Sequence, residues 1–195
     1  MSTWPRPAKI AFIGSHGIRK STACLTFAAC EARGGVSVEL AREVVRDNPL
    51  GFNERATAQA QLWVLMSQVR QELELAAKAD VLVTDRAVMD NFAYFIRAAH
   101  DRNPFGLRPF VERWATTYDL VVRLTPDVAL NADGVRSTDE AFRVEIEGIL
   151  DEILPALVPA DRLVVMPASR VTRRFDWWPL AEDLATRVGG RLYIV

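Results

Sequence analysis

The sequence has little lysine, cysteine or histidine and no long apolar run. Only 2 of its 195 residues are cysteine, and glycine and proline number 10 each, too few for a disulfide-rich or collagen-like scaffold. The 24 basic and 25 acidic residues leave a net charge of −1, which gives no basic field for non-specific nucleic-acid binding. Half of the residues are apolar, which excludes disorder and predicts one globular domain over 1–195.

The sequence shows no sign of a membrane or secreted protein. No window approaches the roughly 20 apolar residues of a membrane span, and the first residues lack the layout of a signal peptide. Cys24 and Cys30 lie six residues apart in a predicted helix, on well-separated faces, so we expect two buried thiols in a reducing compartment. We therefore expect a soluble, cytoplasmic protein that acts as a monomer or homodimer.

The shortage of lysine singles out the few that are present. Of the 24 basic residues 21 are arginine, and the lysines are Lys9, Lys20 and Lys78. Since the chain uses arginine wherever generic positive charge is needed, a retained lysine suggests a role that arginine does not fill.

Six short apolar runs alternate with stretches of helical spacing. The runs cover 9–13, 36–40, 81–84, 120–124, 163–166 and 192–195, and a helical pattern covers 58–79. Apolar strands that alternate with helices are typical of a parallel sheet covered on both faces. The sequence predicts an α/β domain, with 192–195 as the candidate for an extra edge strand.

A glycine loop follows the first of these runs and leads into a predicted helix. It consists of Gly14, Ser15, His16, Gly17, Ile18, Arg19, Lys20, Ser21 and Thr22. Glycines let backbone N–H groups wrap phosphate oxygens, and a helix N-terminus adds partial positive charge. In such a phosphate-binding loop, or P-loop, Lys20 reaches the phosphates and Ser21, beside Thr22, ligates Mg²⁺. We therefore predict a nucleotide site along 14–22.

Arg19 and His16 are two positions of this loop whose side chains the motif does not require. Arg19 stands where the usual motif has glycine. If the backbone there takes a positive φ, the Cβ of Arg19 strains the loop, and its guanidinium either adds charge toward the nucleotide or faces solvent. His16 is interpreted as a side chain near the phosphates rather than as a general base.

An acidic residue ends the run at 81–84. Asp85 would face the Mg²⁺ at the carboxyl edge of the sheet, although an Asp-Arg pair that caps the next helix is the alternative. Arg86 would then hold an anionic group of the substrate.

A second acidic residue is expected at the same edge. Glu39 is taken as the end of the second strand, where a general base for a substrate hydroxyl belongs, with Arg42 beside it for substrate binding. A solvated edge carboxylate is the alternative for Glu39. On the helix that follows, Trp63 and Gln59 or Gln61 are candidates for recognising a base.

A turn and two arginines follow the fourth strand. Asp133-Gly134 is a turn signal, and Ser137 with Glu140 resembles a capping box that opens a helix. Arg136 and Arg143 could close over the phosphates as a lid around 131–143 and neutralise developing charge.

Together these segments resemble a known group of proteins. The loop 14–22, Glu39-x-x-Arg42, Asp85-Arg86 with Asp90, Asn91 and Tyr94, and Asp133-Gly-Val-Arg136 resemble the AAA-like P-loop group that includes nicotinamide riboside kinase domains, and more broadly thymidylate-kinase-like and deoxynucleoside-kinase-like enzymes. The resemblance covers residues 9–166. It implies a three-layer α/β P-loop NTPase fold with a five-stranded parallel sheet of order 2-3-1-4-5, the use of ATP and Mg²⁺, and transfer of the γ-phosphoryl.

The predicted function is therefore a kinase for a small acceptor, of nucleoside, nucleotide or nicotinamide-riboside type. Lys20, Glu39, Asp85, Arg136 and Arg143 are its candidate catalytic residues. An ATPase, GTPase or switch module without a small-molecule acceptor is the alternative, and a P-loop protein that has lost catalysis through Arg19 is a third. Nucleic acid is not the expected partner, although Arg170, Arg173 and Arg174 near Trp177 and Trp178 leave a polynucleotide acceptor open.

Overall fold

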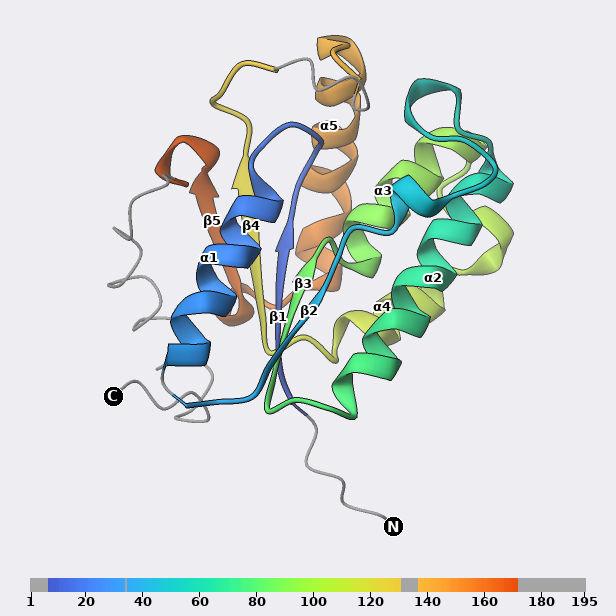
Figure 1. Cartoon of the computed structure of the whole chain (residues 1–195). Coiled ribbons are helices and arrows are strands. Elements are labelled where there is room, and N and C mark those ends of the chain that lie inside the picture. Colours follow the sequence, from blue (N-terminus) through green and yellow to red (C-terminus); the bar gives the residue numbers. More distant parts are fainter. Residues whose placement is uncertain (1–6, 34, 131–136, 172–195) are drawn as a thin grey trace.

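Five parallel strands form one sheet at the centre of the molecule (Figure 1). The computed structural model describes residues 7–33, 35–130 and 137–171. The strand order is β2-β3-β1-β4-β5, which confirms the expected α/β fold and its topology. The strands are β1 (Ala8–Ile13), β2 (Val38–Ala41), β3 (Val81–Asp85), β4 (Leu120–Thr125) and β5 (Leu163–Pro167). The run at 192–195 lies outside the described residues.

Helices cover the sheet unequally on its two faces (Figure 1). In the described ranges, α1 (Lys20–Arg33) packs on one face, where Phe27 meets Phe12 of β1. The other face carries a larger core built with α2 (Ala58–Ala76), α3 (Val88–Ala99), α4 (Arg108–Ala115) and α5 (Glu140–Leu157). Short 3₁₀ turns occupy Val45–Asp47, Asn53–Arg55, Pro104–Gly106, Ala160–Arg162 and Ala168–Arg170.

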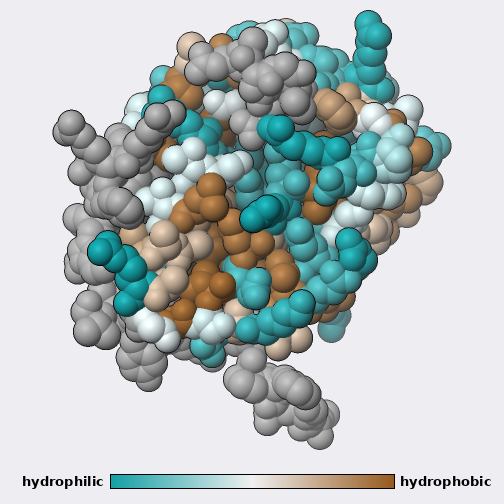
Figure 2. All heavy atoms as spheres, viewed as in Figure 1, coloured by the Kyte–Doolittle hydropathy of each residue, from teal (hydrophilic) through white to brown (hydrophobic). Residues whose placement is uncertain are grey.

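The burial of each strand follows its place in the sheet. All residues of the central strands β1 and β3 are buried, whereas Val38, Glu39 and Leu40 of the edge strand β2 are only partly buried. The apolar side chains in the middle of Figure 2 lie over α1 and β2, in keeping with the exposed Leu25 of α1. Central strands covered on both faces need continuous apolar runs, which is why their positions could be predicted.

The start of α5 differs from the capping box predicted at Ser137 and Glu140. Asp139 is the N-cap, and its carboxylate accepts hydrogen bonds from the N–H groups of Ala141 (2.8 Å) and Phe142 (3.2 Å). The Ser137 hydroxyl instead bonds the Glu54 carboxylate in the β2–α2 connection. The predicted box was therefore wrong, because an aspartate two residues later reaches the free N–H groups of the first turn.

Two other expectations concern the chain as a whole. Cys24 and Cys30 are both buried free thiols, as expected. Within the part of the chain described, no helix combines the length and apolar character that crossing a membrane requires.

The parallel strands bring several loops to one edge of the sheet. Phe12 of β1 lies opposite Asp85 of β3, and Ala41 of β2 lies opposite Thr84. The loop after β1, the end of β3 and the chain just beyond β2 are therefore neighbours at the carboxyl edge, where α/β folds bind ligands.

Candidate active site

The glycines of the loop between β1 and α1 are required by its path. Gly14 has φ +133°, and a Cβ there would lie 2.5 Å from the Leu124 carbonyl oxygen. Gly17 has φ +74°, and a Cβ there would lie 2.5 Å from the Leu130 side chain. The positive φ at both positions, the close approach of β4 to Gly14 and that of the Leu130 side chain to Gly17 disfavour a side chain here. The loop thus has the wrapped form that a phosphate cradle needs.

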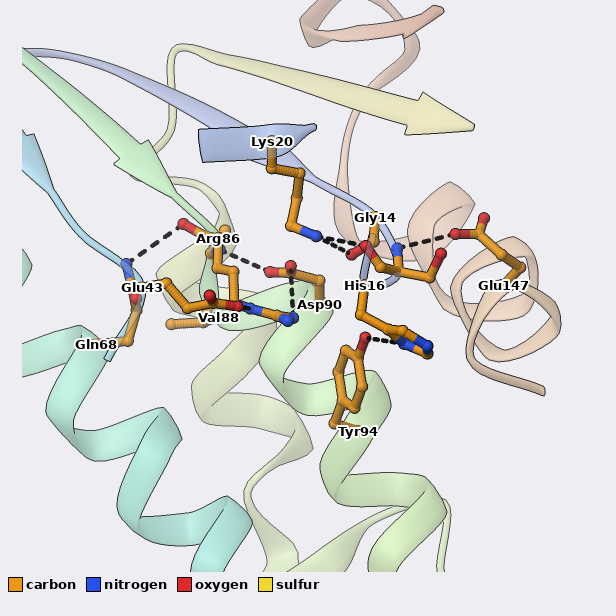
Figure 3. A network of polar contacts seen from close by, with 12 residues as sticks. Gly14, His16, Lys20, Glu43, Gln68, Arg86, Val88, Asp90, Tyr94 and Glu147 are labelled. Atoms are coloured by element: carbon orange, nitrogen blue, oxygen red, sulfur yellow. Dashed lines mark hydrogen bonds and ion pairs between the residues drawn. The ribbon is translucent and has the colours of Figure 1, made fainter. Parts of the chain in front are cut away.

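Lys20, the first residue of α1, is buried under this loop (Figure 3). Its Nζ donates hydrogen bonds to the carbonyl oxygens of Gly14 (3.0 Å) and Ser15. Burial, and then the positive charge of Arg86, lower the pKa of Lys20 to about 8. In the described part of the chain no carboxylate forms an ion pair with it. A buried ammonium held only by carbonyl dipoles is electrostatically suited to an arriving anion.

The chemistry expected of Ser21 and Asp85 fits a magnesium ion. Asp85 ends β3, and the Ser21 hydroxyl hydrogen-bonds to its carboxylate. Burial raises the pKa of Asp85, and its Oδ1 has no hydrogen-bond partner among the described residues. A hydroxyl and a buried carboxylate oxygen are the hard ligands that Mg²⁺ takes from a protein when phosphates supply others. The described residues contain no cluster of three or more acidic, histidine or cysteine side chains that could hold a metal ion.

Arg86 is the centre of an ion-pair cluster beside Lys20 (Figure 3). Its Nε donates to Glu43 Oε1 at 2.7 Å and its Nη1 to Asp90 Oδ2 at 3.4 Å. The guanidinium carbon lies 4.8 Å from the centre of the Tyr94 ring. Burial raises the pKa of Asp90 to about 6, although the charges of Arg86 and Lys20 oppose the shift. Arg86 was predicted to hold an anionic substrate group, and it already holds two carboxylates of the protein.

Asp90 also explains how α3 begins. Its Oδ1 accepts a hydrogen bond of 2.6 Å from the Ala87 N–H, at the N-cap. The alternative in which Asp85 and Arg86 cap this helix is therefore wrong, because Asp90 does so from inside the first turn.

Glu39 was predicted to end β2, and this position is wrong; Glu43 is the glutamate that lies beside Arg86. β2 continues to Ala41, and Glu39 lies opposite Leu82, about 10 Å along the strand from the level of Asp85. Glu43, two residues past the strand, reaches Arg86. Arg42 is exposed and does not line the pocket described next. Where a short edge strand ends is weakly marked in sequence, so the choice between two glutamates four residues apart could not be made.

A pocket opens beside the loop, and we call it the side pocket. Three aromatic rings, Phe52, Tyr94 and Phe142, contribute to its wall, and the ion-pair cluster contributes Glu43 and Arg86. The remaining lining residues come from the loop, the β2–α2 connection, α2 and α3: His16, Val45, Arg46, Asn53, Gln61, Val64 and Asn91. Of the proposed base-recognising residues Gln61 is part of this lining, whereas Gln59 and Trp63 are not. Tyr94 was part of the family resemblance, but the sequence did not show that its ring shares a pocket with Phe52 and Phe142, because the three residues come from separate segments.

His16 joins the loop to the side pocket. Its Nδ1 lies 3.3 Å from the Tyr94 hydroxyl, and its ring stacks on Phe142 with centroids 5.1 Å apart. Burial, and then the charge of Lys20, lower the pKa of His16 to about 4. The imidazole is thus neutral at pH 7 and presents a flat polar ring between the loop and the pocket.

Arg143 and Arg19 are both held by backbone carbonyls. Arg143, in the first turn of α5, donates to the Glu140 carboxylate (2.6 Å) and to the Val128 carbonyl (2.9 Å). Arg19 has φ 65°, the positive value that its glycine-like position suggested, and its Nη1 donates to the Val171 carbonyl at 2.9 Å. The predicted lid residue Arg136 lies outside the described residues.

Known structures share this fold. The crystal structure of NadR protein in complex with NAD and AMP-PNP aligns with a TM-score of 0.65 and 14% identity over 97% of this chain and 51% of that chain. The crystal structure of NadR protein in complex with NR gives 0.68 and 13%, over 97% and 53%. The chain thus spans about half the length of these NadR chains.

Comparison of the sequence with known protein families identifies the family of this chain. Among curated proteins, none matches the chain. A family model described as an AAA domain matches residues 9–173, which include the loop, Asp85 and, apart from Ala8, the strands β1 to β5. The chain therefore belongs to the AAA domain family of P-loop NTPases.

Proposed function

We propose that this protein is a cytoplasmic, ATP- and Mg²⁺-dependent phosphotransferase that moves the γ-phosphoryl group to a small acceptor. The observation that carries the proposal is the side pocket, which shares His16 with the P-loop and has Glu43 and Arg86 in its wall. A P-loop ATPase needs only water as its acceptor, whereas aromatic side chains in a pocket wall are suited to contact a flat organic molecule. The acceptor we favour is therefore a nucleoside, a nucleotide or a nicotinamide-riboside-like compound.

The P-loop side of the site would bind the triphosphate. Backbone N–H groups of the loop and the N-terminus of α1 would hold the phosphates, and Lys20, which now donates to loop carbonyls, would add its positive charge. Ser21 and Asp85 would hold Mg²⁺, which neutralises phosphate charge when bound. Arg143, and Arg136 in the lid, would add positive charge as the phosphoryl group leaves.

The side pocket would orient the acceptor hydroxyl. Glu43 is the carboxylate that we assign to accept its proton, in place of Glu39, because it lies at the pocket wall beside the P-loop. Arg86 holds Glu43 by a 2.7 Å hydrogen bond and favours its ionised form, which is the form that accepts a proton. Catalysis would consist mainly of positioning and charge neutralisation.

Relatives in fold are consistent with this chemistry. NadR has been crystallised with AMP-PNP, an ATP analogue, with NAD and with NR. The shared architecture supports ATP as the donor and a small molecule in the pocket. The identity of the acceptor is left to experiment.

The test is a transfer screen with radiolabelled ATP and Mg²⁺ over nucleosides, nucleotides and nicotinamide riboside. We expect label on one acceptor class, lost in Lys20→Ala and kept in Lys78→Ala, which removes an exposed lysine outside the site. Label that appears only as free phosphate would favour the ATPase, GTPase or switch alternative. A Lys20→Ala variant with full transfer would exclude the proposed mechanism.

A further inference from the structure

The peptide unit between Gly14 and Ser15 is held from both sides of the P-loop (Figure 3). Its carbonyl, that of Gly14, accepts a hydrogen bond of 3.0 Å from Lys20 Nζ. Its N–H, that of Ser15, donates to Glu147 Oε1 of α5 at 2.9 Å. Gly14 and Ser15 are both buried. One peptide of the loop thus connects the P-loop lysine to a carboxylate on a distant helix.

Glu147 is in turn fixed by a buried arginine. Arg123 Nη2 donates to Glu147 Oε2 at 2.9 Å, and Arg123 Nη1 donates to Asp151 Oδ1 at 2.6 Å. Arg123 lies in β4 directly opposite Ile13, the last residue of β1 before the loop. The side chains of Arg123 and Glu147 are 10% and 12% exposed, whereas that of Asp151 is 69% exposed. The sheet therefore determines where the Glu147 carboxylate lies.

A P-loop benefits from such an anchor before its ligand arrives. Converging N–H groups repel one another when no anion is bound, and the loop contains three residues of positive φ, Gly14, Gly17 and Arg19. A hydrogen bond to a carboxylate is stronger than a neutral one and limits the alternatives open to the loop. A lone carboxylate next to an anion site would repel phosphate, but the charge of Arg123 offsets that of Glu147.

We propose that Glu147 is a positioning residue for nucleotide binding. It holds the Ser15 N–H, and through the Gly14–Ser15 peptide it fixes the Gly14 carbonyl that receives Lys20, so that the loop is shaped for the triphosphate in advance. The inference rests on the nucleotide-binding half of the proposed function and is independent of the acceptor.

The experiment compares Glu147→Ala, Glu147→Gln and Asp151→Ala in the full chain. Asp151→Ala is the matched control, because it removes the other carboxylate partner of Arg123, one turn along α5, without touching the loop. Isothermal titration with Mg·ATP should give a Kd about tenfold higher for Glu147→Ala, the effect of losing one charged hydrogen bond. Glu147→Gln retains an oxygen for the Ser15 N–H and should bind within about threefold of wild type. Asp151→Ala should bind as wild type does.

Two results would overturn the assignment. One is a Kd for Glu147→Ala equal to that of Asp151→Ala; the other is a Glu147→Gln variant as weak as Glu147→Ala with an unchanged melting temperature. If wild type binds no Mg·ATP, the proposed function fails, and hydrogen exchange at the Ser15 amide then decides this inference. Exchange that is faster in Glu147→Ala than in Asp151→Ala supports the anchor, and equal rates refute it.

Discussion

Two of the three lysines are buried, Lys9 within β1 and Lys20 at the start of α1, and their surroundings are opposite in kind. Lys9 Nζ lies 2.5 Å from Glu72 Oε2 and donates to Thr117 Oγ1 at 2.7 Å, with the rings of Tyr118 and Trp114 within 4.9 Å. Lys20 Nζ meets two carbonyl oxygens. The Lys9 charge is matched by an opposite charge, whereas that of Lys20 is not.

The surroundings of Glu72 complete the contrast. Its carboxylate also accepts hydrogen bonds from the Tyr118 hydroxyl (2.7 Å), Trp114 Nε1 (2.9 Å) and Gln68 Nε2 (2.9 Å). A buried pair with every oxygen satisfied fixes how α2, α4 and β1 pack. A buried cation that forms no ion pair with a carboxylate, and whose pKa is lowered by burial and then by the charge of Arg86, is instead suited to a ligand. Burial of a lysine alone therefore does not indicate function, but the balance of its partners does.

The largest effect is expected from Lys20→Met. Phosphoryl transfer should fall by about 10²–10³-fold, because one positive group facing the developing charge is lost. The free energy of unfolding should stay level or rise, since an unmatched ammonium is no longer buried. Steady-state transfer assays and urea unfolding measure the two effects, with Lys78→Met as the exposed control. A large loss of stability would show that Lys20 is a structural residue like Lys9.

Lys9→Met should reverse this pattern. The free energy of unfolding should fall by about 3 kcal/mol or more, because Glu72 keeps its charge inside the protein without its cation. Transfer by the folded fraction should change little. Adding Glu72→Gln to Lys9→Met should restore part of the stability, which urea unfolding of the single and double variants would measure. A double variant less stable than Lys9→Met alone would contradict the ion-pair explanation.

The pH dependence of stability gives a second test of the difference between Lys9 and Lys20. The pKa of Lys20 is about 8 in the folded protein, mainly through burial, against 10.5 as the ordinary value. Between these values the unfolded chain binds more protons than the folded one, so the contribution of Lys20 raises stability as pH increases. The unfolding free energy of wild type should therefore increase relative to that of Lys20→Met from pH 8 to 10.5. A difference that is constant over this window would mean that Lys20 is not desolvated.

The features that could be predicted from the sequence are those that depend on a local pattern of residues. Each of the five described strands follows from an apolar run, and Gly14, Gly17 and Lys20 follow from the spacing of the loop. Glu43 was missed because the end of a half-buried edge strand carries no strong signal. The partners of Lys9 were also beyond sequence, since Glu72 and Thr117 come from two other segments. The scarcity of lysine singled out both positions without showing which of them belongs to the site.

The smallest effect concerns Arg19, the departure from the usual loop. The φ of 65° costs a side chain about 1 kcal/mol that glycine does not pay. Arg19→Ala keeps that strain and loses the bond to the Val171 carbonyl, whereas Arg19→Gly loses the bond but relieves the strain. Arg19→Gly should therefore be more stable than Arg19→Ala by about 1 kcal/mol. Because the loop already follows its path with Arg19 in place, the Kd for Mg·ATP should differ between wild type and Arg19→Gly by less than about threefold. Urea unfolding and calorimetry measure both quantities. A tenfold gain in Mg·ATP affinity in Arg19→Gly would show that Arg19 distorts the phosphate-binding loop. The charge of Lys20 would then contribute less to nucleotide binding in the natural protein than the loop geometry allows.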